Sequence, residues 1–304
     1  MAHPIDAVLI AGPTASGKSA AALALAEEFG GTVINADSMQ VYRELRILSA
    51  RPSDQDMARA PHLLYGHVGA RELYSVGRYQ IDAIGALVRA QPRLPIFVGG
   101  TGLYFAALTE GLADIPRVPA DIRARARDKL AALGVAGLHA ELKERDPETA
   151  AQLRPTDPQR VLRAWEVFDA TGRPLASWQQ EAGAPVLAGL KLAKFVLDVP
   201  RYELRERIRL RFLAMLEAGA RAEAAVLKGL DPVLPAAKLL GLRELWALEE
   251  GAMTEADAVT AAVTATRQFA KRQLTWFRHR MGDWIWVEVD DDNNFIAEMR
   301  QYFL

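Results

Sequence analysis

The sequence predicts an α/β protein: a P-loop-containing parallel-sheet core with an inserted all-helical domain. Three observations predict it. Short apolar or β-branched runs alternate with helical patterns over the first hundred residues, a glycine-rich loop follows the first run, and residues 117–188 show helical patterns only. Strands alternating with helices are typical of a parallel sheet covered by helices. We therefore expect a core of residues 1–116 and 189–304 and a helical insertion of residues 117–188.

The first elements of the core follow in order. Residues 7–11 are a compact apolar run, and residues 18–29 form an Ala- and Leu-rich helical pattern that Gly30 and Gly31 would close. Residues 32–35 and 95–98 are two more short strand-like runs. Because the apolar character of these runs is continuous rather than alternating, we expect strands that are buried on both faces.

The second half of the chain predicts the insertion and the return to the core. Residues 120–133 are rich in Ala and Arg and residues 158–170 are amphipathic, so both are predicted helices. Residues 192–199 are a predicted strand, helices dominate from Tyr202 onward, and residues 284–289 are a last predicted strand. The Asp and Asn residues at 290–294 are expected to form a solvated turn.

Length and composition narrow the function classes. The 304 residues suit about two domains, and the absence of cysteine excludes disulfides, cysteine nucleophiles and cysteine-ligated metals. With 37 Lys and Arg against 38 Asp and Glu, the net charge is −1, so a polyanionic partner needs a local basic surface. No apolar stretch approaches 18 residues and no leader pattern is visible, so we expect a cytoplasmic protein with no membrane partner. The five histidines lack metal-ligand spacing.

A Walker A pattern follows the first predicted strand and opens the first predicted helix. Such a loop points successive N–H groups inward and adds the positive end of a helix, which together cradle a phosphate. Lys18 would supply a charge to a terminal phosphate, and the Ser19 hydroxyl would hold Mg²⁺. The expected ligand is a nucleoside triphosphate, such as ATP, or a diphosphate attached to a group other than a nucleoside. The alternative to a phosphate-binding loop is an ordinary glycine turn. The motif consists of Gly12, Pro13, Thr14, Ala15, Ser16, Gly17, Lys18 and Ser19.

Two polar residues follow later strands. Asp37 comes directly after the second strand, and Thr101 follows the strand at 95–98. Because ligands of open parallel sheets bind outside the carboxyl ends of the strands, both are expected near the phosphate loop. Asp37 would then be a general base or a metal-bound acceptor. The alternative for each residue is an N-cap of the next helix.

Two basic stretches could bind a polyanion despite the neutral total. Residues 267–280 carry five Lys and Arg, no acid, and the aromatic residues Trp276 and Phe277. Cations interleaved with aromatic rings suit RNA, whereas a solvated helix face over a core is the alternative. Residues 201–211 carry five Arg with Glu203 and Glu206, which would also fit an intrahelical ion-pair ladder.

An ordered set of motifs carries a resemblance to a known family. The set comprises residues 12–19, 37–42 and 99–104, and then the segments 157–164 (DPQRVLRA), 240–244 (LGLRE) and 271–278 (KRQLTWFR). Over about residues 6–280 the chain resembles the tRNA dimethylallyltransferases, also called tRNA isopentenyltransferases. The family usually has Tyr where this chain has Leu242.

The resemblance implies an activity. Dimethylallyl diphosphate would donate its dimethylallyl group to N6 of the adenosine 3′-adjacent to the anticodon, in tRNAs that read codons beginning with U. The P-loop would then hold the donor diphosphate rather than ATP, with Arg207 and Arg211 nearby and Mg²⁺ at Ser19. Asp37 would be the catalytic base and Thr101 would lie near the reacting centre. The enzyme is expected to be a cytoplasmic monomer.

The resemblance also implies a tRNA-binding set, part of it in the helical insertion. For Arg123 an ordinary surface helix is an equal alternative, because Asp121 and Asp128 lie close in sequence. The implied tRNA contacts are Asp37, Ser38, Met39, Gln40, Thr101, Arg123, Gln159, Arg160, Arg163, Gly241, Arg243, Lys271, Arg272, Gln273, Thr275, Trp276 and Arg278.

Three other functions use the same front half of the chain. A small-molecule P-loop kinase would turn over ATP and use Asp37 to orient an acceptor hydroxyl. An isopentenyltransferase acting on free adenine nucleotides would have no use for the basic stretch at 267–280. An RNA-binding P-loop protein would bind tRNA without forming a product.

Overall fold

A computed structural model describes residues 5–181, 183–289 and 295–303. The chain divides into two compact units: the first comprises residues up to Thr109 and from Val186 onward, and the second comprises Glu110–Pro185. The second unit therefore begins and ends a few residues earlier than the insertion expected at 117–188. The turn expected at residues 290–294 lies outside the described residues.

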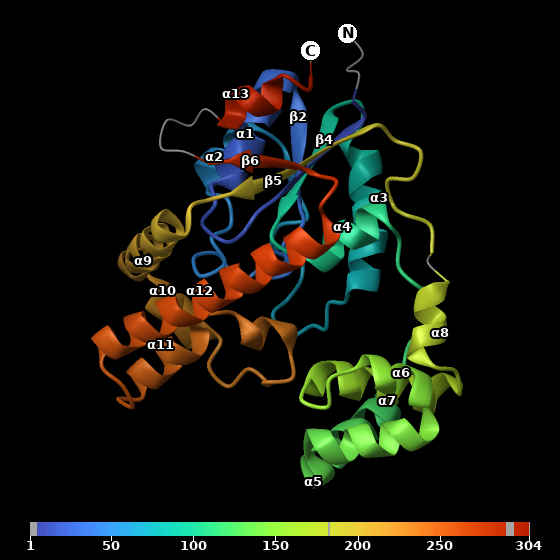
Figure 1. Cartoon of the computed structure of the whole chain (residues 1–304). Helices are drawn as coiled ribbons and strands as arrows, with labels where there is room; N and C mark the ends of the chain where they lie inside the picture. Colours follow the sequence, from blue (N-terminus) through green and yellow to red (C-terminus); the bar gives the residue numbers. More distant parts are fainter. Residues whose placement is uncertain (1–4, 182, 290–294, 304) are drawn as a thin grey trace. The chain divides into compact units, whose positions relative to one another are not determined.

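The first unit is built on a six-stranded parallel sheet (Figure 1). Strands β1 (Ala7–Ala11), β2 (Gly31–Asn35) and β4 (Leu94–Gly99) are buried along their whole length, as their continuous apolar runs predicted. All five predicted strands are confirmed; β3 was not predicted, because two residues leave no periodicity to detect. In the order β3-β2-β4-β1-β5-β6, the strands are β3 (His62–Leu63), β2 (Gly31–Asn35), β4 (Leu94–Gly99), β1 (Ala7–Ala11), β5 (Leu192–Asp198) and β6 (Ile285–Glu288).

Helices cover both faces of this sheet. Leu9 and Phe97 point into one core cluster with α3 (Val76–Ala90) and α4 (Gly102–Thr109), while Val8 and Ile96 point into the other with α1 (Lys18–Phe29). The alternation follows from the two-residue period of a strand. The helices of this unit are α1 (Lys18–Phe29), α2 (Asp54–Arg59), α3 (Val76–Ala90), α4 (Gly102–Thr109), α9 (Arg201–Glu217), α10 (Ala220–Val226), η1 (Pro235–Lys238), α11 (Leu242–Glu249), α12 (Glu255–Arg280) and α13 (Phe295–Arg300).

The helix α12 is the longest element of the first unit. Thr254 caps its N-terminus by accepting a hydrogen bond from the Asp257 N–H, and two acids lie in its first turn. The helix ends in three basic residues, which complement the negative end of the helix dipole. It packs beside α9 and α11 (Figure 1). These contacts bring the basic stretch at 267–280 next to the basic stretch at 201–211.

Among the described residues of the second unit, the regular secondary structure consists of helices joined by loops. Trp165 and Leu138 belong to its separate core, and the Trp165 indole N–H donates to Glu141. The predicted helix at 120–133 continues to Arg145 across a non-helical Gly134 (φ 67°). Its elements are α5 (Ala120–Arg145), α6 (Pro147–Gln152), α7 (Pro158–Thr171) and α8 (Leu175–Gln180).

None of the helices in the described part of the chain is both long and apolar enough to cross a membrane.

Candidate functional site

The loop between β1 and α1 has the geometry of a phosphate cradle. Ala15 (φ 65°) and Gly17 (φ 86°) adopt left-handed backbone conformations, which turn successive N–H groups toward one side of the loop. Only glycine takes such a φ without strain, and Ala15 takes it in a loop that packs against the core. Within the described chain, α1 has no side-chain cap at its N-terminus and no acid in its first turn. Its positive end is therefore available to an anion.

Two further groups of this loop fit a bound phosphate. The Ser16 hydroxyl is buried and has no hydrogen-bond partner among the described residues. The Lys18 ammonium donates to the carbonyl of Pro13 at 3.2 Å. Burial lowers the pKa of Lys18 to about 8; Asp37 opposes this shift and Arg211 adds to it. A bound anion would satisfy the hydroxyl and would restore the favourable charged state of the lysine.

The helix α9 brings Arg211 to the same loop. The Arg211 guanidinium donates to the Thr14 hydroxyl, and burial lowers the pKa of this arginine, although Asp37 acts in the opposite direction. Arg207, one turn earlier, forms an ion pair with Glu203 at 3.2 Å. Of the two arginines predicted near the diphosphate, the structure therefore brings Arg211 into direct contact with the loop and pairs Arg207 on its own helix.

Gln273 of α12 joins the phosphate loop to the glycine loop after β4. Its side-chain carbonyl accepts from the Thr14 N–H at 3.0 Å, and its amide donates to the carbonyl of Gly100 at 2.8 Å. The side chain is buried, and a Cβ at Gly100 would lie only 2.3 Å from the Gln273 amide nitrogen. Both ends of its amide are used inside the protein, and the expected tRNA contact by this residue stays a prediction. Gln273 is a clamp between two loops.

Asp37 is held in a tight turn after β2. Asn35 accepts from the Asp37 N–H at 2.9 Å and donates to its carbonyl at 2.9 Å, while Asp37 Oδ1 accepts from the Met39 N–H at 2.9 Å. The alternative of a helix N-cap is wrong, because the next helix begins at Asp54. Asp37 Oδ2 has no hydrogen-bond donor among the described residues and faces Gly100, where an added Cβ would be 3.3 Å away. One carboxylate oxygen is thus available for an incoming proton.

Thr101 packs its hydroxyl against the same turn. It accepts from the Ser38 N–H at 2.9 Å and donates to the Ser38 hydroxyl at 3.2 Å. Thr101 precedes α4, and its backbone carbonyl accepts from Tyr104 at 2.9 Å, but the hydroxyl is directed to Ser38 rather than to the helix. This contact ties the loop after β4 to the turn after β2.

The remaining predicted tRNA contacts of the first unit differ in exposure. Gln40 is buried and donates to the carbonyls of Ser49 and Ala50, so its amide supports a loop, and its expected tRNA contact stays a prediction. Gly241 is buried at the start of α11 and offers backbone alone. The Trp276 ring packs against Gly102, where a Cβ would lie 2.3 Å from the ring. Exposed side chains are those of Arg243, Lys271, Arg272, Thr275 and Arg278.

The second unit carries its own basic cluster. Burial lowers the pKa of Arg163, and Arg123 adds to this effect, whereas Glu166 opposes it. Arg163 pairs with Glu166 at 3.8 Å, and Arg160 pairs with Asp157 at 3.4 Å. The structure therefore brings Arg123 and Arg163 near each other on α5 and α7. Gln159 and Arg160 are exposed on the first turn of α7.

Sequence reasoning missed one functional support, Asn35. This residue is fully buried at the end of β2 and holds Asp37 through both ends of its amide. It also donates to the carbonyl of Leu64, so it connects β2 to the end of β3. In the sequence, the signal for this role is an amide side chain at the end of a strand-like run. A buried amide must form hydrogen bonds, so it connects to neighbouring backbone groups.

Comparison with known proteins identifies the family. The IPP transferase profile matches residues 40–280, and the isopentenyl transferase profile matches residues 5–65. The chain belongs to the IPP transferase family. A tRNA dimethylallyltransferase of Azorhizobium caulinodans is 53% identical over 285 residues, which cover 92% of this chain and 91% of the relative. The predicted family and the predicted class of enzyme, a prenyltransferase, are confirmed.

Solved structures agree with this assignment. The tRNA isopentenylpyrophosphate transferase of Bacillus halodurans is 32% identical with a TM-score of 0.67, covering 97% of this chain and 95% of that one. A eukaryotic dimethylallyltransferase acting on tRNA is 27% identical with a TM-score of 0.81, covering 97% of this chain and 77% of that one. The predicted fold class, an α/β P-loop core, is confirmed.

Proposed function

We propose that this enzyme transfers the dimethylallyl group of dimethylallyl diphosphate to N6 of the adenosine 3′-adjacent to the anticodon, in tRNAs that read codons beginning with U. The products are N6-dimethylallyladenosine and diphosphate. The observation that carries the proposal is the Gln273 clamp, because it joins the phosphate loop to the glycine loop that faces Asp37. A phosphate cradle and an available carboxylate oxygen therefore belong to one rigid junction.

In the proposed reaction, the phosphate cradle acts on the leaving diphosphate and the Asp37 carboxylate acts on the adenosine. As the bond between the allylic carbon and the diphosphate oxygen breaks, negative charge grows on the diphosphate. Lys18, Arg211 and the N–H groups of the loop stabilise that charge, which is the larger electrostatic task. The adenosine N6 forms the new bond to carbon and loses its proton to Asp37. Thr101 holds the Asp37 turn through Ser38.

The site would bind Mg²⁺ through few protein ligands. Among the described residues no cluster of three His, Asp or Glu side chains could hold a metal. Mg²⁺ is usually bound through one or two protein oxygens together with substrate phosphates. Ser19, exposed at the start of α1, would hold the ion, which would neutralise charge on the leaving diphosphate. The same cradle would serve the donor diphosphate in place of ATP.

The tRNA would be held by exposed and half-buried residues of both units. In the first unit we propose Ser38, Met39, Arg243, Lys271, Arg272, Thr275, Trp276 and Arg278, with Gly241 offering backbone alone. In the second unit we propose Arg123, Gln159, Arg160 and Arg163. The target base must leave its stack at a cost of a few kcal/mol, and a single-stranded anticodon loop lowers this cost. A monomer acting in the cytoplasm is part of the same proposal.

A transfer assay tests the proposal. Purified protein, Mg²⁺ and radiolabelled dimethylallyl diphosphate are mixed with unmodified tRNA, and with AMP in a parallel reaction. We expect label in tRNAs that carry adenosine after an anticodon ending in A. Label in AMP alone would assign the enzyme to the free-nucleotide class. ATP hydrolysis without any labelled product would assign it to the kinases or the nucleotide-switched RNA-binding proteins.

A further inference from the structure

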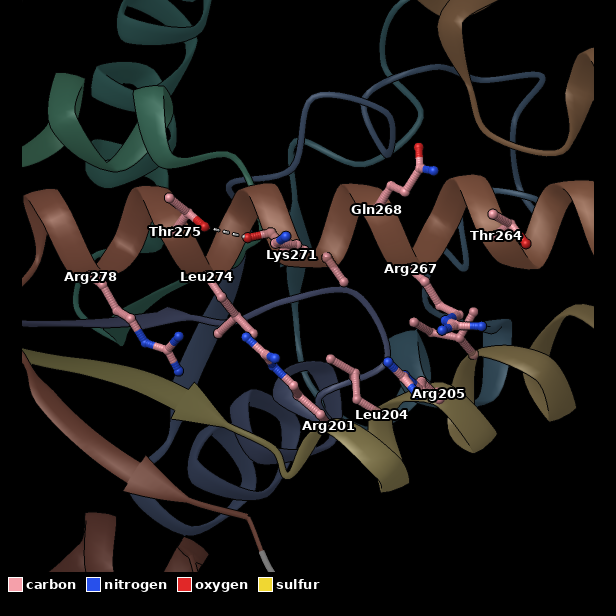
Figure 2. Close-up of a pocket in the computed structure, with 12 residues that line it drawn as sticks. Arg201, Leu204, Arg205, Thr264, Arg267, Gln268, Lys271, Leu274, Thr275 and Arg278 are labelled. Carbon is pink, nitrogen blue, oxygen red and sulfur yellow. Dashed lines mark hydrogen bonds between the residues drawn. The ribbon is translucent and has the colours of Figure 1, made fainter.

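A basic groove lies between α9 and α12, on the first unit (Figure 2). Its volume is about 350 Å³. Figure 2 shows Arg267 and Arg278 extending from α12 toward α9, and Arg201 and Arg205 extending from α9 toward α12. With Lys271, five cations line the groove, and none of its lining residues in the described chain is an acid. The floor is apolar, formed by residues such as Leu204 and Leu274, which belong to the core.

The cations of this groove differ from the other arginines of the same helix. On α9, Arg207 pairs with Glu203 and Arg209 pairs with Glu206, so the ion-pair ladder considered from the sequence forms for these two. Arg201, Arg205, Arg267 and Lys271 have no ion-pair partner among the described residues. Arg278 makes a long ion pair with Asp198 at 3.4 Å. Like charges gathered without counter-ions are unfavourable unless a polyanion neutralises them.

The shape and chemistry of the groove favour phosphates over bases. Recognition of unstacked RNA bases uses aromatic rings. None of the lining residues in the described chain is aromatic. Trp276 of the same helix packs against Gly102, on a different side of α12. From Arg267 to Arg278 the helix rises about 17 Å, which is long enough to face several consecutive phosphates. The groove therefore suits a nucleic-acid backbone outside the loop that enters the catalytic site.

We propose that the groove between α9 and α12 binds the phosphate backbone of the tRNA stem, and that Arg201, Arg205 and Arg267 are tRNA-binding residues. This inference rests on the proposed function. It adds a sequence-independent contact to the base-specific contacts at the catalytic site. Backbone contacts of this kind fix register and orientation without reading bases.

A charge-matched pair of triple variants tests the groove. The test variant is Arg201→Gln, Arg205→Gln, Arg267→Gln. The control is Arg89→Gln, Arg93→Gln, Lys191→Gln, which removes three exposed cations near the N-terminal ends of β4 and β5. Affinity for unmodified tRNA is measured over a range of salt concentrations. Each lost phosphate contact should flatten the slope of log affinity against log salt by about 0.7 to 0.9, so the slope of the test variant should be shallower by about 2 to 3.

Further measurements separate the possible failures. An oligonucleotide of the anticodon loop alone should bind the test variant as it binds the native protein, because it lacks the stem. Thermal unfolding of both triple variants checks that they are folded. Failure of the native protein to bind or modify tRNA would reject the proposed function itself. Native tRNA binding with an unchanged slope in the test variant, an equal loss in the control, or an equal loss with the loop oligonucleotide would overturn the groove proposal.

Discussion

Replacing Lys18 by Met should stabilise the ligand-free protein. Burial of the Lys18 ammonium group lowers its pKa from 10.5 to about 8. The charge of Arg211 adds to this shift, and the charge of Asp37 opposes it. A difference of that size corresponds to about 3 kcal/mol of destabilisation at pH 7, as an upper limit. The variant also loses the hydrogen bond to Pro13, which costs about 1 kcal/mol. We therefore expect Lys18→Met to raise the free energy of unfolding at pH 7 by about 1 to 2 kcal/mol.

The pH dependence of this gain identifies its cause. The folded native protein releases the Lys18 proton above about pH 8, whereas the unfolded chain keeps it up to about pH 10.5. The unfolded state then binds more protons, so native stability rises with pH across this window. Lys18→Met lacks this rise, and its advantage should shrink by about 2 kcal/mol between pH 7 and pH 9.5. Urea unfolding at the two pH values measures the difference.

A ligand and a control complete the experiment. Diphosphate with Mg²⁺ should stabilise the native protein by mass action and should leave Lys18→Met almost unaffected. Lys191→Met, at an exposed position before β5, should change the free energy of unfolding by less than about 0.5 kcal/mol at either pH. A Lys18→Met protein that is less stable than the native one at pH 7, or a gap that does not depend on pH, would refute the assignment of Lys18 as a buried cation awaiting an anion.

Three further substitutions test the junction of the site. Asp37→Asn should lower the rate of transfer by at least about 100-fold and change tRNA affinity by less than about 2-fold, since the carboxylate acts on a proton; near-normal turnover would reject the base assignment. Gln273→Leu leaves two buried backbone groups unpaired and should lower the melting temperature by several degrees and weaken diphosphate binding, whereas unchanged melting would show that the clamp is dispensable. Gly102→Ala should displace the Trp276 ring and impair transfer while sparing diphosphate binding, which calorimetry can measure.

The sequence predicted those parts of the fold that depend on local pattern. Residues 7–11 and 95–98 are continuous apolar runs, and burial on both faces of the sheet leaves few other structures for them. The helix at 18–29 is predicted with its observed bounds, because Gly30 takes the left-handed conformation that ends it. The helix after Gly134 was missed, since a glycine with positive φ interrupts the pattern and hides that the segment resumes.

The sequence predicted which residues belong to the site better than it predicted the role of each residue. The phosphate loop follows from its spacing, but the choice between base and helix cap for Asp37 depends on Asn35, a contact between a strand end and the turn after it. The choice for Thr101 depends on Ser38, 63 residues away. Such contacts over long sequence separation leave no periodic signal in a single chain. Motif position placed Gln273 in the tRNA-binding set, while its burial and its two bonds make it a clamp.

The stretch at 267–280 shows why one motif can hold several functions. Residues on a helix rotate by about 100° each, so Gln273 and Lys271 lie on nearly opposite sides of α12. Gln273 joins the phosphate loop to Gly100, Trp276 lies against Gly102, and Lys271 lines the groove with α9. The same helix therefore supports the catalytic junction on one side and presents cations on another. Since the two sides are linked by one rigid element, a tRNA backbone bound in the groove would be held in register with the base at Asp37. It follows that substitutions on the groove side should change tRNA affinity and its salt dependence, whereas substitutions at Gln273 should change diphosphate binding and the stability of the catalytic junction.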